Sequence, residues 1–290
     1  MKALFFPFLM GLVLCCTQVP ANAQEFNEHI SKEFTLKAPA ASSVLAIYNI
    51  EGPIRVEGYS GDKVVIEINK TISAKTNDDL ETGKKEFRLE FEQTSDTIIC
   101  YIAEPWDSRP HSYRNRQDDW HHRDIDYRYN LEFTVKVPFA MNLAVSTVNK
   151  GNISVKDVAG SLKVHNVNGG ISIANAKGAS DIRTVNGAIT VNYLNVPPDD
   201  CFYNTINGEL NITYPTSLSA DLEFKSMNGA FYTDFSNTEV LPFKVTKNKE
   251  SNGESTVYKI SKNREVRIGT GGKKLKFETL NGNIYIKKQS

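Results

Sequence analysis

The feature that most constrains the fold is a short motif that returns at nearly constant spacing. An apolar residue followed by Asn and Gly, once with a Lys between them, recurs every 18 to 21 residues at Val148, Val167, Val185 and Ile206. Weaker half-repeats at 158–164 and 176–182 each lie about nine residues from the neighbouring motifs. Such a period is typical of a solenoid, in which each repeat is one coil. The sequence therefore predicts an all-β, single-domain β-solenoid of the β-helix or β-roll kind.

Alternation around each motif predicts which side chains enter the core. Ile153 and Val155 flank Ser154, so one face of each strand is predicted to be buried and the other wet. We assign the apolar residue before Asn-Gly, such as Val167, to the buried set and Ser172 to solvent. The Asn-Gly pair is predicted to form the corner, because Gly reaches positive φ without steric cost and Asn tolerates the left-handed region.

The Asn side chains of the corners are predicted to form a structural ladder. Amides repeated once per coil can hydrogen-bond along the stack and satisfy backbone groups of the turns. The alternative is a polar stripe that lines a ligand. The ladder comprises Asn149, Gly151, Asn168, Gly169, Asn186, Gly187, Asn207, Gly208, Asn228, Gly229, Asn281 and Gly282.

The rest of the chain divides around these repeats. Residues 138–237 are predicted to form the regular coils, and 33–137 less regular N-terminal coils that include the motif-like segment 42–59. Residues 76–86 have the capping and acidic signals of a short helix, with Asn77 as a possible cap. Residues 238–290 are predicted to hold an insertion with strands in LPFKVTK and STVYKISK, followed by a closing coil.

The N-terminal 23 residues resemble a secretory signal peptide. Lys2 precedes an apolar run that is too short to span a bilayer, and Ala21-Asn22-Ala23 offers a cleavage site. Lipid attachment at Cys15 is less favoured, because Leu14 is large for the preceding position. We therefore expect an exported protein of 24–290, in the periplasm or at the cell surface, without a transmembrane segment. Whether Cys100 and Cys201 are bonded stays open.

Composition excludes several functions. Lys plus Arg and Asp plus Glu both total 34, which gives no charge-based reason to expect nucleic acid or anionic membrane as a partner. No zinc-binding or calcium-loop motif is present, so no metal or cofactor is predicted. The carboxylates Asp157, Asp181 and Glu209 fall in no common column of the coils. We therefore predict a non-enzymatic protein, and a β-helix enzyme acting on polysaccharide is the less favoured alternative.

A polar insertion at 104–128 interrupts the strand pattern. It holds both tryptophans of the chain together with histidines and arginines. Flat rings can stack on sugars or partners, and Arg makes forked hydrogen bonds. The alternative is a plain connection between two strands. The candidate binding residues are Trp106, Arg109, Tyr113, Trp120, His121 and His122.

Four segments carry a family resemblance: YNIEGPIRVEGY, LEFTVKVP, the serial TVNG-type motifs, and IGTGGKKLKFETLNGNIYI. With them the chain resembles the bacterial family of exported β-strand-repeat domains called putative adhesins, related to the head GIN domains. The resemblance implies a β-solenoid in the cell envelope that binds a carbohydrate or protein partner. A periplasmic accessory or sensor protein in envelope regulation is the alternative. The family supplies no active site to carry over.

Overall fold

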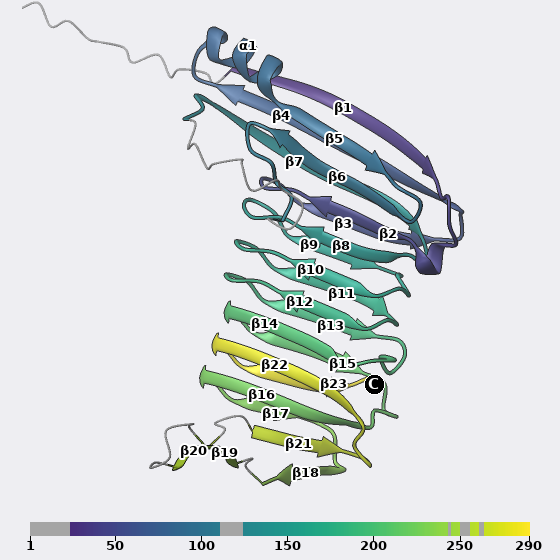
Figure 1. The fold of residues 1–290 in the computed structure, drawn as a ribbon, viewed down its shortest axis with the longest axis vertical. Coiled ribbons are helices and arrows are strands. Elements are labelled where there is room, and N and C mark those ends of the chain that lie inside the picture. The colour runs from purple at the N-terminus through teal and green to yellow at the C-terminus, as the bar shows by residue number, and fades with distance from the viewer. Residues whose placement is uncertain (1–23, 111–123, 243–244, 250–255, 261–263) are drawn as a thin grey trace, which may run out of the picture.

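The structure is a computed structural model that describes residues 24–110, 124–242, 245–249, 256–260 and 264–290. The predicted signal peptide, 1–23, lies outside the described residues. The chain forms an elongated stack in which two large sheets lie face to face along the whole length (Figure 1). The prediction of an all-β solenoid is confirmed.

Within the described residues, one sheet has ten strands and the other eleven. The ten-stranded sheet runs, in spatial order, through β1 (Gln24–Thr35), β4 (Lys63–Ala74), β7 (Tyr127–Pro138), β3 (Ile54–Tyr59), β9 (Ile153–Lys156), β11 (Ile171–Ala176), β13 (Ile189–Tyr193), β15 (Leu210–Tyr214), β23 (Ile284–Lys288) and β17 (Phe231–Thr233). The eleven-stranded sheet runs through β18 (Thr238–Leu241), β21 (Arg264–Ile268), β16 (Ala220–Asn228), β22 (Lys273–Asn281), β14 (Cys201–Asn207), β12 (Ser180–Arg183), β10 (Leu162–His165), β8 (Asn142–Ser146), β2 (Val44–Tyr48), β6 (Thr97–Glu104) and β5 (Arg88–Gln93).

Each regular coil gives one strand to each sheet, and the coils stack in parallel. On one side Val164 of β10 lies in register with Val145 of β8 and Ile182 of β12. On the other side Ile173 of β11 is in register with Val155 of β9 and Val191 of β13, so apolar side chains form continuous buried columns between the sheets. The alternation in the sequence thus defines the core.

The residue before Asn-Gly is not part of this core, and the assignment of Val167 to it was wrong. Val164 and Asn166 point inward, whereas Val167 is half-buried on the outside of the corner. The same column becomes more exposed along the stack, to 40% at Ile206 and 72% at Met227. The inward position of the corner is polar because the corner backbone needs a hydrogen-bonding partner, as described below.

The N-terminal end is closed by antiparallel strands. β1 pairs with β4, β4 with β7, and β5 with β6, whereas β6 and β7 also continue the parallel stack beside β2 and β3. Helix α1 (Asn77–Glu86) packs on this end, and its cap is Thr76 rather than Asn77, since the Thr76 hydroxyl accepts from the Asp79 N–H at 3.2 Å. The only other helical segment in the described chain is the 3-10 turn Ala40–Ser42.

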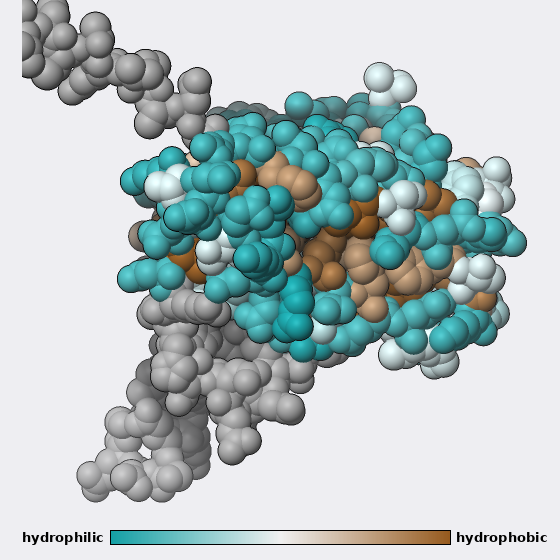
Figure 2. Space-filling view, turned by 90° about the horizontal axis from the view of Figure 1, so that it is seen from above, coloured by the Kyte–Doolittle hydropathy of each residue, from teal (hydrophilic) through white to brown (hydrophobic). Residues whose placement is uncertain are grey.

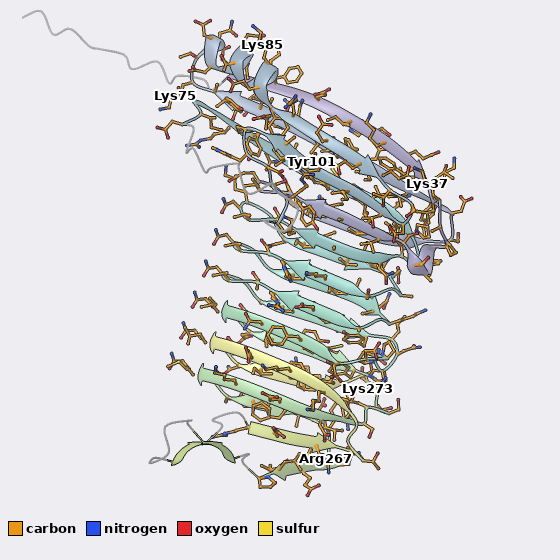
Figure 3. The ribbon with its side chains drawn as sticks, viewed as in Figure 1. Lys37, Lys75, Lys85, Tyr101, Arg267 and Lys273 are labelled. Carbon is orange, nitrogen blue, oxygen red and sulfur yellow. The ribbon has the colours of Figure 1, made fainter. Side chains whose placement is uncertain are left out.

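Apolar side chains are visible at this end of the molecule. Figure 2, seen from the α1 end, shows brown apolar surface between hydrophilic rims. The terminal strands β1 and β5 contribute half-buried Phe34 and Phe91, whose ring centroids lie 6.0 Å apart. Charged residues are found at both ends of the stack, with Lys75 and Lys85 near α1 and Arg267 on β21 at the opposite end (Figure 3).

The segment predicted to close the stack lies inside it. The coil β22–β23 stacks between the coil β14–β15 and the coil β16–β17, although β16–β17 precedes it in the sequence. The C-terminus therefore lies beside β15, well above the lower end of the stack in Figure 1. The expectation of a closing coil was wrong, because the parallel register of β22 with both β14 and β16 places this coil in the middle.

The chain between β17 and β22 returns along the outer edge. β21 pairs antiparallel with both β16 and β18 and so extends the eleven-stranded sheet past the last coil. The strands expected in LPFKVTK and STVYKISK are present as β19 (Val245–Lys249) and β20 (Thr256–Ile260), which pair with each other in a separate two-stranded sheet.

Three tyrosines form a polar network inside the core. The Tyr193 and Tyr203 hydroxyls lie 2.7 Å apart, and the Tyr214 hydroxyl donates to that of Tyr203 at 3.1 Å. Tyr193 also donates to Ser180 Oγ at 2.6 Å. Burial raises the pKa of all three phenols well above the ordinary value, because a phenolate would be poorly solvated there.

Both described cysteines are free and buried. Cys201 lies on β14 beside the tyrosine network, and Cys100 lies on β6 with four strands between them in the eleven-stranded sheet. Neighbouring strands are about 4.8 Å apart, so the two thiols are too distant for an intramolecular disulfide.

Candidate binding surface

The corner asparagines form an unbroken ladder down one side of the stack. Each side-chain amide donates to the amide oxygen of its neighbour at 2.7 to 2.8 Å. The ladder ends on a carboxylate, because Asn149 donates to Glu51 Oε1 at 3.0 Å. In spatial order it comprises Asn228, Asn281, Asn207, Asn186, Asn168, Asn149 and Glu51.

A second column of polar side chains, which was not predicted from the sequence, lies behind the first. The buried hydroxyls of Thr147, Thr184 and Thr205 each donate to a corner glycine carbonyl of the adjacent coil at 2.9 Å. Asn166 replaces the hydroxyl in its coil and donates to Gly151 O at 2.9 Å. The Thr, Asn or Ser two residues before the motif's Asn is the signal for this column, since a buried polar side chain requires a partner.

The corner glycines are required for a different reason from the one expected. Most of them do not have positive φ; Gly52 and Gly282 are the corner glycines that do. Instead, a Cβ on Gly169 would lie 2.2 Å from the Gly151 carbonyl oxygen, and one on Gly187 would lie 2.2 Å from that of Gly169. The coils stack so closely at this corner that only glycine fits.

We expect the ladder to stabilise the stack modestly. Asn186→Ala removes one amide donor and one acceptor from the middle of the ladder, so the free energy of unfolding should fall by about 1 to 2 kcal/mol. Thermal melting checks this, with Asn211→Ala on the outer face of β15 as a control that should melt close to the wild type. Equal melting of both variants would contradict a stabilising ladder.

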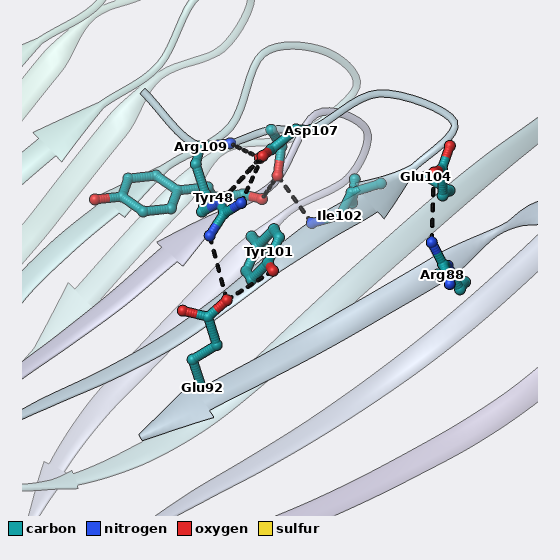
Figure 4. A network of polar contacts seen from close by, with 9 residues as sticks. Tyr48, Arg88, Glu92, Tyr101, Ile102, Glu104, Asp107 and Arg109 are labelled. Atoms are coloured by element: carbon teal, nitrogen blue, oxygen red, sulfur yellow. Dashed lines mark hydrogen bonds and ion pairs between the residues drawn. The ribbon is translucent and has the colours of Figure 1, made fainter. Parts of the chain in front are cut away.

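The start of the 104–128 insertion is fastened to the outer face of the eleven-stranded sheet (Figure 4). Arg109 is paired with Asp107 at 2.7 Å and with Glu92 at 3.2 Å, and its guanidinium lies 4.0 Å from the centre of the Tyr101 ring. Ser108 Oγ donates to Tyr48 O at 2.6 Å. Burial, followed by the hydrogen bond to Glu92, raises the pKa of Tyr101 to about 12.

This network changes the reading of two candidate residues. Arg109 holds the insertion on β5 and β6, so its guanidinium is committed to internal contacts rather than presented to a ligand. Trp106 is 37% exposed and is available for contact. The other four candidates lie outside the described residues: Tyr113, Trp120, His121 and His122.

The ten-stranded sheet carries an outward column that runs over most of the stack. Successive members are in register on adjacent strands, and none of them enters the core. In spatial order the column is Arg55, Ser154, Ser172, Thr190, Asn211, Tyr285 and Tyr232.

Small side chains in this column leave a hollow, here called the trough. It has a volume of about 830 Å³ and crosses β3, β9, β11 and β13. Three strand spacings of about 4.8 Å make it roughly 14 Å long. Its lining includes the hydroxyls and amides of Asn152, Ser154, Asn168, Ser172 and Thr190, with Arg55 and Lys150 at one end.

Two stacked tyrosines lie further along the same column. The Tyr232 and Tyr285 rings are 5.0 Å apart and 12° from parallel, and Tyr232 is 50% exposed. Asn283 Nδ2 donates to the Tyr285 hydroxyl at 3.0 Å. A trough of hydroxyls that leads to an aromatic platform can hold a flat, hydroxyl-rich ligand.

The opposite sheet presents a different surface. Its groove of about 460 Å³ is lined by large charged residues, including Lys163, Asp181 and Lys276. The Phe202 ring there lies under the Arg183 guanidinium, at 4.7 Å, and is therefore already covered. His165 on the same face is half-buried, and burial lowers its pKa.

Among the described residues, no cluster of three His, Cys, Asp or Glu side chains could hold a metal ion. Within the same part of the chain, no helix has the length and apolar character needed to cross a membrane.

Two large sheets of mainly parallel strands, a corner ladder and an outward column define a two-sheet β-solenoid. The model of the family Toastrack DUF4097 matches residues 140–287. The chain belongs to this family, and the family resemblance indicated by the repeat motifs is confirmed.

The solved structures that match the chain include three from bacteria, all at low sequence identity and low TM-score. A "putative cell adhesion protein" from Clostridium sporogenes is 13% identical, with a TM-score of 0.42, and the match covers 91% of this chain and 100% of that one. A "putative adhesin" from Bacteroides fragilis is 9% identical, with a TM-score of 0.38 and coverage of 90% and 97%. A "putative lipid binding protein" from Parabacteroides distasonis is 9% identical, with a TM-score of 0.24 and coverage of 93% and 98%. No curated protein matches the sequence.

Proposed function

We propose that this protein is a non-enzymatic, exported component of the cell envelope that binds a glycan or protein partner on the outer face of its ten-stranded sheet. The observation that carries the proposal is the trough and its column of hydroxyls, which continues to the stacked tyrosines. The secretory features of residues 1–23 support export.

The interior of the stack supports a binding role rather than a catalytic one. The buried polar groups described above are engaged in stacking hydrogen bonds: Thr184 with a glycine carbonyl, and Tyr193 with Tyr203. Chemistry on a bound partner would need a positioned acid or base in the trough, and its lining holds no carboxylate or histidine. The trough is therefore suited to hold a partner without changing it.

The insertion 104–128 is a second proposed contact surface. Its described part presents Trp106 on the outer face of the opposite sheet, held in place by the Arg109 network. An aromatic side chain on an anchored segment can stack on a partner at little entropic cost.

Blocking the trough should abolish binding. Ser172→Trp places a large ring in the middle of the trough from an outward position, so the coil should still fold. We expect at least a tenfold loss of affinity for envelope polysaccharides and surface extracts, measured with purified protein on a glycan array and by titration. The matched control is Lys163→Trp, an outward position of the same coil on the other sheet, which should bind as the wild type does.

Melting curves of both variants establish that each is folded. If the two variants bind equally well, the trough is not the binding site. If the wild type binds no envelope component, the proposed function is wrong.

A further inference from the structure

Arg55 is the unusual residue of the trough. It is exposed on β3, and its in-register neighbours on either side are the neutral Thr134 and Ser154. Within the described residues it forms no ion pair. The guanidinium is thus a cation with five donors directed at solvent.

Two other cations near the trough are paired with carboxylates, and Lys136, which lines the adjoining hollow with Arg55, adds to the positive charge. Lys150 pairs with Glu51 at 3.0 Å, and Lys156 lies 3.7 Å from Glu57. Because these charges are locally balanced, Arg55 supplies an excess of positive charge at its end of the trough.

The lining of the trough contains two cations and no carboxylate. Glu51 lies at the Arg55 end but is held by Lys150, and Glu209 lies in the next coil beyond Ala188, past the far end. The favourable potential for an anion is therefore confined to the Arg55 end. Hydroxyls and amides, which suit neutral sugar hydroxyls, occupy the rest of the lining.

The floor of the trough is more open than the fold demands. Gly170 lies on the floor, and a Cβ there would meet its nearest atom, Ala188 O, at 3.3 Å. A Cβ on the adjacent Gly169 would lie only 2.2 Å from the Gly151 carbonyl oxygen. Packing against the neighbouring backbone therefore requires glycine at 169, whereas at 170 the absence of a side chain leaves that part of the lining open.

We infer that the ligand of the trough is a carboxylate-bearing oligosaccharide, seated with an acid group on Arg55 and its ring hydroxyls along Ser154, Ser172 and Thr190. This inference rests on the proposed binding function. The planar guanidinium matches a carboxylate in a forked pair of hydrogen bonds. The strand spacing then sets the hydroxyls in a row about 4.8 Å apart along the remaining chain.

Three acidic polysaccharides serve as probes: polygalacturonate, alginate and hyaluronan. Fully methyl-esterified polygalacturonate has the same backbone without the charge, and dextran is the neutral reference. We expect at least one acidic probe to bind saturably, with an affinity that falls as salt rises. Where polygalacturonate is bound, methyl esterification should weaken binding about tenfold or more.

Arg55→Gln tests the anchor. It should weaken binding of the acidic probe about tenfold and reduce its salt dependence, while leaving the melting temperature unchanged. Lys163→Gln makes the same change in net charge on the opposite sheet and should bind as the wild type does. Equal losses in both variants would show a nonspecific charge effect and overturn the inference.

The outcomes separate this inference from the function on which it rests. If the wild type binds none of the three acidic probes but binds dextran or a protein from the envelope, the acidic ligand is wrong and the binding function stands. If it binds no envelope component at all, both are wrong. If Arg55→Gln binds the acidic probe as tightly as the wild type does, the probe does not bind in the trough and the inference is wrong.

Discussion

Gly169→Ala should destabilise the protein severely, whereas Gly170→Ala should change its free energy of unfolding little. A Cβ on Gly169 would lie 2.2 Å from the Gly151 carbonyl oxygen and 2.7 Å from Asn166 Nδ2. Since the oxygen belongs to backbone that is fixed by stacking, relief requires the two coils to separate and weakens the hydrogen bonds at the corner. We expect a loss of about 3 kcal/mol or more in the free energy of unfolding.

Gly170→Ala is the matched control, because the two glycines are adjacent and neither has positive φ. Its Cβ would meet Ala188 O at 3.3 Å and Asn152 Oδ1 at 3.7 Å, so we expect a change within about 1 kcal/mol. Thermal and urea unfolding of both variants measure the difference. Comparable destabilisation of the two would show that glycine serves backbone flexibility here rather than close stacking.

The second large effect is expected at alkaline pH. Burial raises the pKa of Tyr193, Tyr203 and Tyr214 above the ordinary value of 10.0. In the unfolded chain these phenols lose their protons above pH 10, whereas in the folded protein they keep them. Unfolding therefore releases protons in this range, so the stability contributed by the three groups is complete below pH 10 and falls as the pH rises.

A phenol with a pKa of 10.0 in the unfolded chain is half ionised at pH 10, so each group costs about 1 kcal/mol between pH 10 and pH 11, and the three together cost about 3 kcal/mol. Urea unfolding at pH 8, 10 and 11 measures this loss. Tyr214→Phe removes one of these titrating groups and should reduce the loss between pH 10 and pH 11 by about 1 kcal/mol. Stability that stays constant between pH 8 and pH 11 would contradict the burial of these phenols.

The repeat made the fold predictable, but not the order of the coils. A period of 18 to 21 residues with alternating apolar residues is enough to indicate a solenoid and its inward columns. Every motif offers the same Asn, Gly and apolar groups, so the coil around Asn281 fits beside Asn207 as well as Asn228 would. Long-range register therefore decided the order, and it leaves no local signal in the sequence.

The inward assignment failed at the corner for a specific reason. Strict alternation from Val164 places Asn166 inside and Val167 outside, whereas the assignment from the sequence placed the apolar Val167 inside. The structure follows alternation, because Asn166 and its threonine equivalents bind the glycine carbonyls of the neighbouring coil. A buried polar position that returns once per coil is thus a sign of backbone bonding between coils.

The trough could not be found from the linear sequence, because Ser154, Ser172 and Thr190 are ordinary outward residues until the register aligns them. The tryptophans and histidines of 104–128 drew attention by composition alone. Arg109, the charged candidate from that segment, holds the insertion on the sheet. Arg55 lies in an ordinary strand sequence, and its composition gives no sign of a function. What distinguishes Arg55 is that it has no ion-pairing partner among the described residues. This feature is visible only in the three-dimensional structure.

The position of the coil β22–β23 limits the order in which the coils can stack during folding. Coils from β8 to β15 can stack one after another as the polypeptide is delivered, each on a finished neighbour. The coil β16–β17 cannot, since the surface on which it rests is made from residues 273–288, which are synthesised later. Until that segment arrives, the apolar faces of Phe224 and Phe231 have no partner coil. The native packing of the coil β16–β17 is therefore completed only after residues 273–288 have been inserted, and until then its apolar side chains are open to aggregation.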